Sequence, residues 1–258
     1  MKTVKILMLT AVLTLGWGCS SSDDDDTSSS SAATFAESER PSWSVNLSGN
    51  DTAPGWQDIG RTQYESWMYV TVRLQDELAA HVSSDDRMVV FIGDEQRTMP
   101  AAPNIYDDGS AYFVLTIGGN STDREINIRL CYWCSQLHQL FTIEEKTTFT
   151  PELPYGNTSD YVPPLLKGSR KYPVQNLLTV SLPAQLPFTL TDSDLVAAFV
   201  GDECRGVGAV GKPFTVFRTS VGETLQLRYY SSGKAGIYSI QETVALAENE
   251  SKNITIAF

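Results

Sequence analysis

Short runs in which apolar and polar residues alternate recur along the whole chain. They occupy Val70–Leu74, Ile126–Leu130, Leu178–Leu182, Leu225–Tyr229 and Ile254–Phe258. A period of two over about five residues is the pattern of a strand with one buried face. Clusters of Gly, Pro, Asn, Asp and Ser separate the runs, and no stretch beyond the amino terminus keeps a helical apolar period. We therefore predict an all-β protein built from many short strands.

The order of these runs is repeated within the chain. A shift of 108 residues places Met88–Arg97 on Val196–Arg205, with Phe, Gly, Asp, Glu and Arg identical at matching positions. Farther along, shifts of 101 and then 99 place Phe113 on Phe214 and the run at 126–129 on that at 225–228. Because the gaps fall only in turn-rich places, the pattern indicates a tandem duplication.

We therefore predict two tandem β-sandwich domains, residues 40–166 and 167–258. The later part of Pro154–Lys171, which contains several Pro and Gly residues, would link them. About 220 residues suffice for two domains of ordinary size.

The matched hairpins predict specific contacts. Gly93 and Gly201, each followed by Asp, would supply the positive φ that tight hairpin turns need. Phe199 and Cys204 would then lie opposite each other on one face, and Cys204 would act as a small buried hydrophobic residue.

One acidic and one basic residue follow each of these turns. Glu95 and Arg97 in the first copy match Glu203 and Arg205 in the second. Strand alternation puts both members of each pair on one face, which we expect to point toward solvent.

The amino terminus has the pattern of an export signal. Two lysines precede an uncharged apolar run, Ile6–Trp17, of about a dozen residues, which is too short to span a bilayer. Met1–Gly18 is therefore predicted to be a signal peptide. A small residue before the lone Cys19 resembles the bacterial lipobox, in which the cysteine is acylated and anchors the mature protein to the membrane. An ordinary signal peptide cut near Gly18 is the alternative.

Residues 19–39 are predicted to be a disordered, acidic tether. Ser20–Ser31 holds four consecutive aspartates and no apolar residue, so it cannot bury enough surface to offset its ordering entropy. An acidic run directly after the lipid-bearing Cys19 resembles the surface-export signal of Bacteroidetes lipoproteins. That resemblance implies an outer-membrane protein facing the cell exterior, whereas a plain spacer would leave it facing the periplasm.

Net charge narrows the choice of partners. Removal of Lys2 and Lys5 with the signal peptide leaves 17 basic against 31 acidic residues, a formal net charge of −14. Such acidity disfavours binding to nucleic acid or to anionic lipid.

The repeat resembles a module common in surface lipoproteins and secreted proteins of Bacteroidetes. The resemblance rests on Arg40–Trp43 and on Asp194–Gly206, and it extends over residues 40–258. It implies an immunoglobulin-like sandwich at the cell surface, with no catalytic residue to carry over. The first copy departs from the motif at Arg97–Met99, where the Arg-Gly of the second copy is lost.

No residue pattern supports a catalytic site, a metal site or a cofactor. The two histidines, His81 and His138, fall at non-matching positions of the two copies. A catalytic triad needs a histidine beside a nucleophile and an acid, and zinc needs several close ligands.

Cys131 and Cys134 have the spacing of a redox CxxC, but they follow a strand instead of opening a helix. On a continuing strand they would lie about 10 Å apart on opposite faces. In a turn they could form a small disulfide; otherwise they are free or buried thiols.

If that turn forms, it exposes Tyr132 and Trp133 as a platform on which a sugar ring could stack. Trp56, in a Pro- and Gly-containing stretch, is a second loop aromatic. Capping of the sandwich core is the more common role of such rings. Asp86 and Asp194 match across the copies, which favours a shared structural role in turns over calcium binding.

These observations favour a non-enzymatic surface lipoprotein that binds a ligand or mediates adhesion, with a glycan as first choice and a surface protein as another partner. One alternative is a structural subunit of an outer-membrane complex or fibre, and a second is a hydrolase.

Overall fold

The computed structural model describes residues 32–151, 154–155, 161–186 and 188–258. The predicted signal peptide, Cys19 and most of the predicted tether lie outside the described residues. The described chain is all-β with several antiparallel sheets, as the alternating runs predicted. Two buried hydrophobic clusters each lie between two sheets, and we call these units the first and second sheet pairs.

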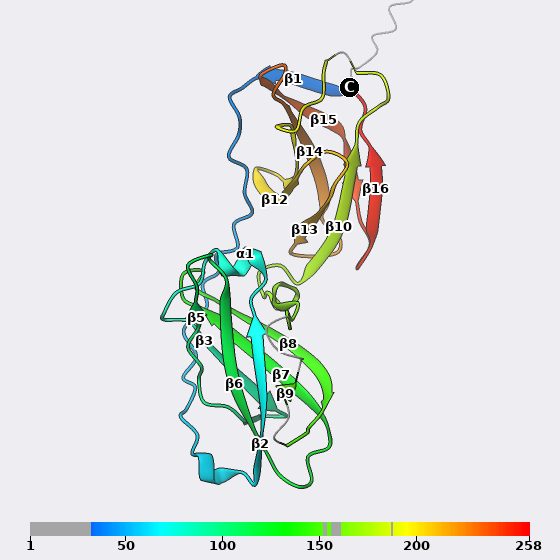
Figure 1. Ribbon diagram of the computed structural model, residues 1–258. Coiled ribbons are helices and arrows are strands. Elements are labelled where there is room, and N and C mark those ends of the chain that lie inside the picture. The colour runs from blue at the N-terminus through cyan, green and yellow to red at the C-terminus, as the bar shows by residue number, and fades with distance from the viewer. Residues whose placement is uncertain (1–31, 152–153, 156–160, 187) are drawn as a thin grey trace, which may run out of the picture. The chain divides into compact units, whose positions relative to one another are not determined.

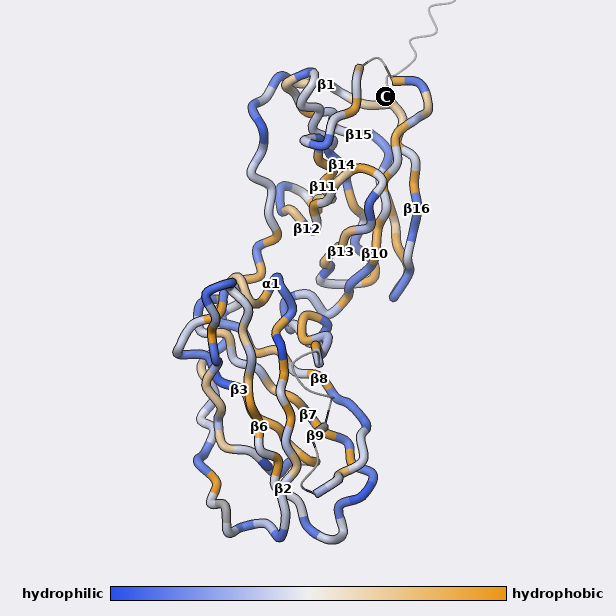
Figure 2. The backbone as a smooth tube through the Cα atoms, viewed as in Figure 1, coloured by the Kyte–Doolittle hydropathy of each residue, from blue (hydrophilic) through white to orange (hydrophobic). Residues whose placement is uncertain are grey.

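The first sheet pair holds two four-stranded sheets in the orders β5-β6-β2-β9 and β4-β3-β7-β8. Its strands are β2 (Ser66–Arg73), β3 (Arg87–Ile92), β4 (Glu95–Gln96), β5 (Asn104–Ile105), β6 (Ala111–Gly119), β7 (Glu125–Cys134), β8 (Gln139–Thr148) and β9 (Pro154–Tyr155). Apolar residues recur along β2, β3, β6 and β7 (Figure 2), and their inward positions form the shared core.

The second sheet pair holds a five-stranded sheet, β1-β15-β14-β11-β12, and a three-stranded sheet, β13-β10-β16. Its strands are β1 (Ala33–Glu37), β10 (Val174–Ser181), β11 (Leu195–Val200), β12 (Glu203–Gly208), β13 (Pro213–Arg218), β14 (Thr224–Ser231), β15 (Gly236–Ala245) and β16 (Ser251–Thr255). Neighbouring strands are antiparallel in both units, except that β9 runs parallel to β2 and β16 parallel to β10.

Strand β1 corrects the predicted extent of the tether. Residues 33–37 are not disordered but form an edge strand beside β15, in register from Ala33↔Ile240 to Glu37↔Gly236 (Figure 1). The ring of Phe35 lies where a side chain on Gly236 would be, and it contacts the ring of Tyr238 at 4.8 Å. The amino-terminal segment therefore completes a sheet formed by the second copy. The physical reason is that Ala33 and Phe35 are apolar, unlike the Ser and Asp residues before them.

The hairpin contacts predicted from the repeat are present. Gly93 and Gly201 adopt φ angles of 59° and 61°. Phe199 pairs with Cys204 across the second hairpin, and both side chains are buried with Ala197. The ring of Trp43 packs edge-on against Phe199 at 5.7 Å.

Helices are few. Among the described residues, α1 (Asp76–Ala79) is one turn of α-helix, and 3-10 turns cover Arg61–Gln63 and Leu165–Gly168. The last of these lies in the predicted linker and buries Leu165 and Leu166 in the first core. In the described part of the chain, no helix has both the length and the apolar character needed to cross a membrane.

Candidate ligand-binding site

The predicted aromatic turn at 131–134 does not form. Strand β7 continues through Cys134, so Tyr132 and Trp133 are strand residues that are 0% and 6% exposed. The ring of Tyr132 packs between Phe113 and Phe141 in the first core. Neither ring offers an exposed face on which a sugar could stack, so the prediction of a platform here is wrong.

Of the two alternatives for Cys131 and Cys134, a small disulfide or free thiols, the structure shows free thiols. Cys131 and Cys134 are both free and buried, and burial raises the pKa of each thiol. Consecutive strand side chains point to opposite faces, so residues three apart on β7 cannot meet.

Trp56 lies in a stretch without helix or strand and is half-buried. Its neighbour Gln57 exchanges two hydrogen bonds with Gln96: the backbone N–H of Gln57 donates to the side chain of Gln96, whose amide donates back to the Gln57 carbonyl. The segment is therefore held against β4, and a binding role for Trp56 stays a prediction.

Asp86 has the shared structural role that its match with Asp194 predicted. It is fully buried, and its carboxylate accepts hydrogen bonds from the Tyr132 hydroxyl at 2.6 Å and from both the backbone N–H and hydroxyl of Ser135. The hydroxyl of Ser83 donates a further one. The carboxylate thus ties the start of β3 to the end of β7.

Asp194 repeats this arrangement in the second sheet pair. It accepts from the Tyr229 hydroxyl at 2.6 Å, from the backbone N–H and hydroxyl of Ser232, and from the hydroxyl of Thr191. Burial alone would raise the pKa of Asp194, but these hydrogen bonds to the charged form outweigh it and lower the pKa.

Arg97 belongs to a second repeated cluster. The prediction that its side chain points toward solvent is wrong. It is 7% exposed, and its guanidinium contacts Glu95 at 3.0 Å and Asp123 at 2.9 Å. It also lies over the ring of Tyr64, whose hydroxyl donates to Glu95 at 2.9 Å. Burial, with the carboxylate of Glu95, raises the pKa of Tyr64 to about 12. The Tyr64 ring occupies the space that a side chain on Gly118 would need.

The same cluster recurs around Arg205, which is 4% exposed and therefore also contradicts the predicted solvent-facing position. It contacts Glu203 at 3.2 Å and Glu223 at 3.0 Å, and lies over the ring of Tyr172. The Tyr172 hydroxyl donates to Glu203 at 2.7 Å. Burial would raise the pKa of Glu223, but hydrogen bonds from Thr219 and the charge of Arg205 together lower it. The buried arginines thus hold the scaffold, whereas Glu95 and Glu203 keep exposed side chains, as predicted.

A different surface gathers exposed and half-buried rings. On the outward side of β2 and β6 lie Trp67, Tyr69, Tyr112 and Val114, and the ring of Tyr106 packs edge-on against Tyr112 at 5.5 Å. We call these five residues the aromatic face. Tyr69 is 42% exposed, Tyr106 56% and Val114 54%.

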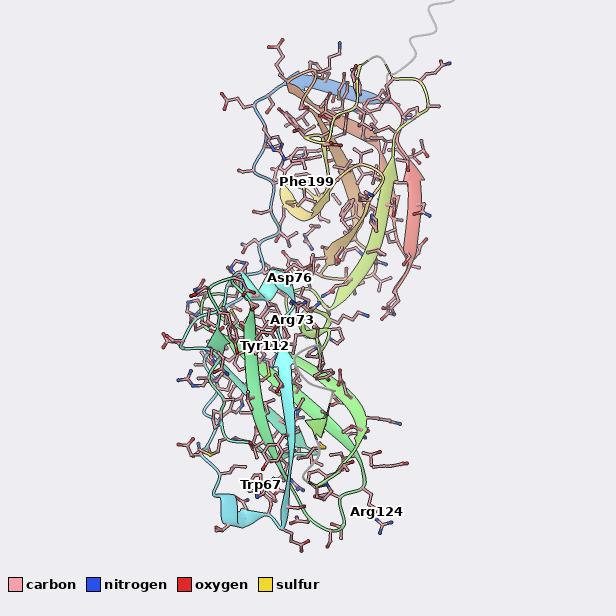
Figure 3. The ribbon with its side chains drawn as sticks, in the orientation of Figure 1. Trp67, Arg73, Asp76, Tyr112, Arg124 and Phe199 are labelled. Atoms are coloured by element: carbon pink, nitrogen blue, oxygen red, sulfur yellow. The ribbon has the colours of Figure 1, made fainter. Side chains whose placement is uncertain are left out.

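The aromatic face extends along the strands. Figure 3 shows Trp67 toward one end of β2, and Arg73 and Tyr112 toward the other. Six residue steps from Trp67 to Arg73, at about 3.3 Å each, make roughly 20 Å. The β2–β6 register places Tyr69 opposite Thr116, and Arg73 opposite Tyr112.

Both ends of the aromatic face are held in place. At one end, the Trp67 ring packs edge-on against Tyr64, which the Arg97 cluster fixes. At the other end, Arg73 makes an ion pair with Asp76 at 3.7 Å, and both side chains keep exposed polar atoms. The surface is therefore a row of rings with charged groups at one end, and it can stack against a flat ligand while bonding its polar rim.

Sequence reasoning missed Tyr69, Tyr112 and Val114. The sequence did hold a signal: β2 and β6 carry large apolar or aromatic residues at the outward positions as well as at the inward ones. In Ser66–Arg73, the even positions Met68, Val70 and Val72 are buried, whereas Tyr69 points outward. An apolar residue on the solvent side of a half-buried strand is the residue to examine for binding.

Comparison of the chain with protein-family models and with curated proteins finds no match to either. Among the described residues, no group of three His, Cys, Asp or Glu side chains could hold a metal ion.

Proposed function

We propose that the protein is a lipid-anchored surface lipoprotein with two tandem immunoglobulin-like sandwich domains, and that it binds a glycan on the aromatic face of the first domain. The row formed by the exposed Tyr69 and Tyr106 with the half-buried Tyr112 carries the proposal. The protein would be attached to the outer membrane through lipidated Cys19 and would face the cell exterior.

The chemistry of the aromatic face fits a sugar. One face of a pyranose ring presents C–H groups and packs well on an aromatic ring, while the hydroxyls at its rim need hydrogen-bond partners. The tyrosines offer rings for the first contact and hydroxyls for the second. Arg73 and Asp76 add a donor and an acceptor at the end of the row.

The rings are also preorganised. Tyr112 and Trp67 each contact a second ring, so less side-chain freedom is lost on binding than for isolated exposed residues. Preorganisation of this kind favours a binding surface over scattered exposed residues.

A glycan-array screen and polysaccharide pull-down, run on soluble protein starting at Ser20, test the proposal. The variant Tyr69→Ala/Tyr112→Ala is expected to bind at least about tenfold more weakly, because each lost stacking contact removes about 1 kcal/mol. Val221→Ala is the matched control, because Val221 is exposed to a similar degree in the second sheet pair.

Unchanged binding in the double variant would move the site away from the aromatic face. Absence of binding to every glycan tested would overturn the proposal and leave the structural-subunit alternative as the working hypothesis.

A further inference from the structure

A groove of about 450 Å³ lies on the second sheet pair, over the outward side of β13, β10 and β16. Its lining includes Gln175, Leu177, Thr215, Asn249 and Ser251, together with Lys167 from the linker turn Leu165–Gly168. The shift of 108 places Gln175 on Trp67 and Leu177 on Tyr69. The groove therefore occupies the surface of the second copy that corresponds to the aromatic face of the first.

The centre of the groove is one row across three strands. Leu177 on β10 pairs with Thr215 on β13 and with Ser251 on β16. Leu177 is 44% exposed, so an apolar side chain lies between two hydroxyl groups. An apolar centre flanked by hydrogen-bonding groups matches a molecule that has both C–H surface and hydroxyls.

Residues 247–250, which precede β16 and form one side of the groove, are held in place by hydrogen bonds from Asn176. Asn176 is buried, and its amide N–H groups donate to the carbonyls of Ala247 at 2.8 Å and Glu250 at 2.9 Å. Its amide oxygen accepts from the buried Arg218 at 2.7 and 3.0 Å. These bonds hold the backbone on both sides of Asn249, which adopts a left-handed φ of 57°.

Several polar side chains of the groove have no partner of their own. Among the described residues, the side chains of Thr215, Asn249 and Ser251 make no hydrogen bond, and the Lys167 ammonium makes no ion pair. Asn176, directly beneath, uses both its amide oxygen and its amide nitrogen. The hydrogen-bonding capacity of the groove is therefore directed outward, where a ligand can use it.

We propose that this groove is a second glycan-binding site, which holds a hydroxyl-rich sugar unit mainly by hydrogen bonds, whereas the aromatic face holds one mainly by stacking. This inference rests on the proposed function. It makes the protein bivalent, so a polysaccharide that engages both sites binds more tightly than a short oligosaccharide that engages one.

The test is binding stoichiometry, measured by isothermal titration calorimetry on soluble protein starting at Ser20. The probes are cello-, xylo-, manno- and chitohexaose, and the variants separate the two sites. Thr215→Val/Asn249→Gly removes a hydroxyl and an amide of the groove but keeps the strand and the left-handed turn, because glycine adopts positive φ readily. Tyr69→Ala/Tyr112→Ala removes the aromatic face. Circular dichroism and melting temperature confirm that each variant is folded.

The expected result is two sites per chain in the unmodified protein and one site in each double variant. A single site that is lost in the Tyr69→Ala/Tyr112→Ala variant but kept in the Thr215→Val/Asn249→Gly variant would contradict binding in the groove. It would leave the proposed function supported. A single site with the opposite pattern would support the groove and overturn the aromatic face. Absence of binding by all four hexasaccharides, together with a negative array, would overturn both proposals.

Discussion

The two copies of the repeat share their buried polar contacts and differ on their exposed faces. Asp86 and Asp194 accept the same set of hydrogen bonds at the same strand ends. The tyrosine–glutamate–arginine clusters around Arg97 and Arg205 likewise match contact by contact. On the outward side of β2 and β10, by contrast, Tyr69 is replaced by Leu177.

This difference shows which positions the scaffold constrains. A buried carboxylate or guanidinium that loses one partner leaves charge or hydrogen-bonding groups unsatisfied, so its whole set of partners must stay together. An outward strand position has no such requirement, and residues there can change without loss of the fold. The outward faces are therefore where we expect the two copies to differ in function.

Loss of either buried aspartate is expected to have the largest effect on stability. Asp86→Ala and Asp194→Ala should each lower the free energy of unfolding of their own sheet pair by about 3–5 kcal/mol, because each leaves one buried tyrosine hydroxyl and several part-buried donors without an acceptor. Hydrogen exchange resolved by mass spectrometry would show faster exchange in β3 and β7 for the first variant, and in β11 and β14 for the second.

The exposed neighbours Asp85 and Asp192 provide matched controls. Replacing either with Ala should change stability by less than about 0.5 kcal/mol. A large effect of one aspartate and a small effect of the other would show that the two networks are not equivalent.

The two copies differ in what covers the edge strands β15 and β8. Removal of β1 tests how much that cover contributes to stability. Strand β15 is covered by β1, which is distant in sequence, whereas β8 is bridged by Ser169 at Phe141. A chain starting at Arg40 should lose about 2 kcal/mol in the second sheet pair, from the lost ladder, the burial of Ala33 and the contact of the Phe35 ring with Tyr238.

The first sheet pair should be unaffected by that truncation, and exchange rates in β15 against β8 would measure the contrast. Faster exchange in both strands would mean that the two units unfold together. An uncovered β15 would also be open to pairing with another chain, which size-exclusion chromatography would detect as a dimer.

The sequence predicted the strands and the hairpins because both depend on local patterns. Alternation located β2, β7, β10 and β14, and the paired glycines located the two turns. The match of Asp86 with Asp194 correctly indicated a structural role.

Predictions that depended on contacts distant in sequence were wrong. Strand β1 was assigned to the tether because its partner, β15, lies about 200 residues farther along the chain. Tyr132 and Trp133 were placed in a turn because the sequence does not show where β7 ends. Arg97 and Arg205 were placed in solvent because their partly buried partners, Asp123 and Glu223, come from the loops that connect β6 to β7 and β13 to β14. In each case the deciding residue lay outside the local window.

The smallest expected effect concerns the hydroxyls of Tyr64 and Tyr172, the two tyrosines whose rings contact Arg97 and Arg205. Tyr64→Phe and Tyr172→Phe should each cost about 1 kcal/mol at neutral pH, because each removes one hydrogen bond to a glutamate. The pKa of Tyr64 is raised in the folded protein to about 12 from 10.0, so its neutral hydroxyl stabilises the fold fully below pH 10. That contribution is lost as the pH rises from about 10 to about 12. Urea unfolding across this interval should therefore show a smaller loss of stability in the Tyr64→Phe variant than in the unmodified protein. If the free energy of unfolding falls equally with pH in the two proteins, the Tyr64 hydroxyl has the same pKa in the folded and unfolded states. That result would contradict an electrostatic contribution of the hydroxyl to the Arg97 cluster.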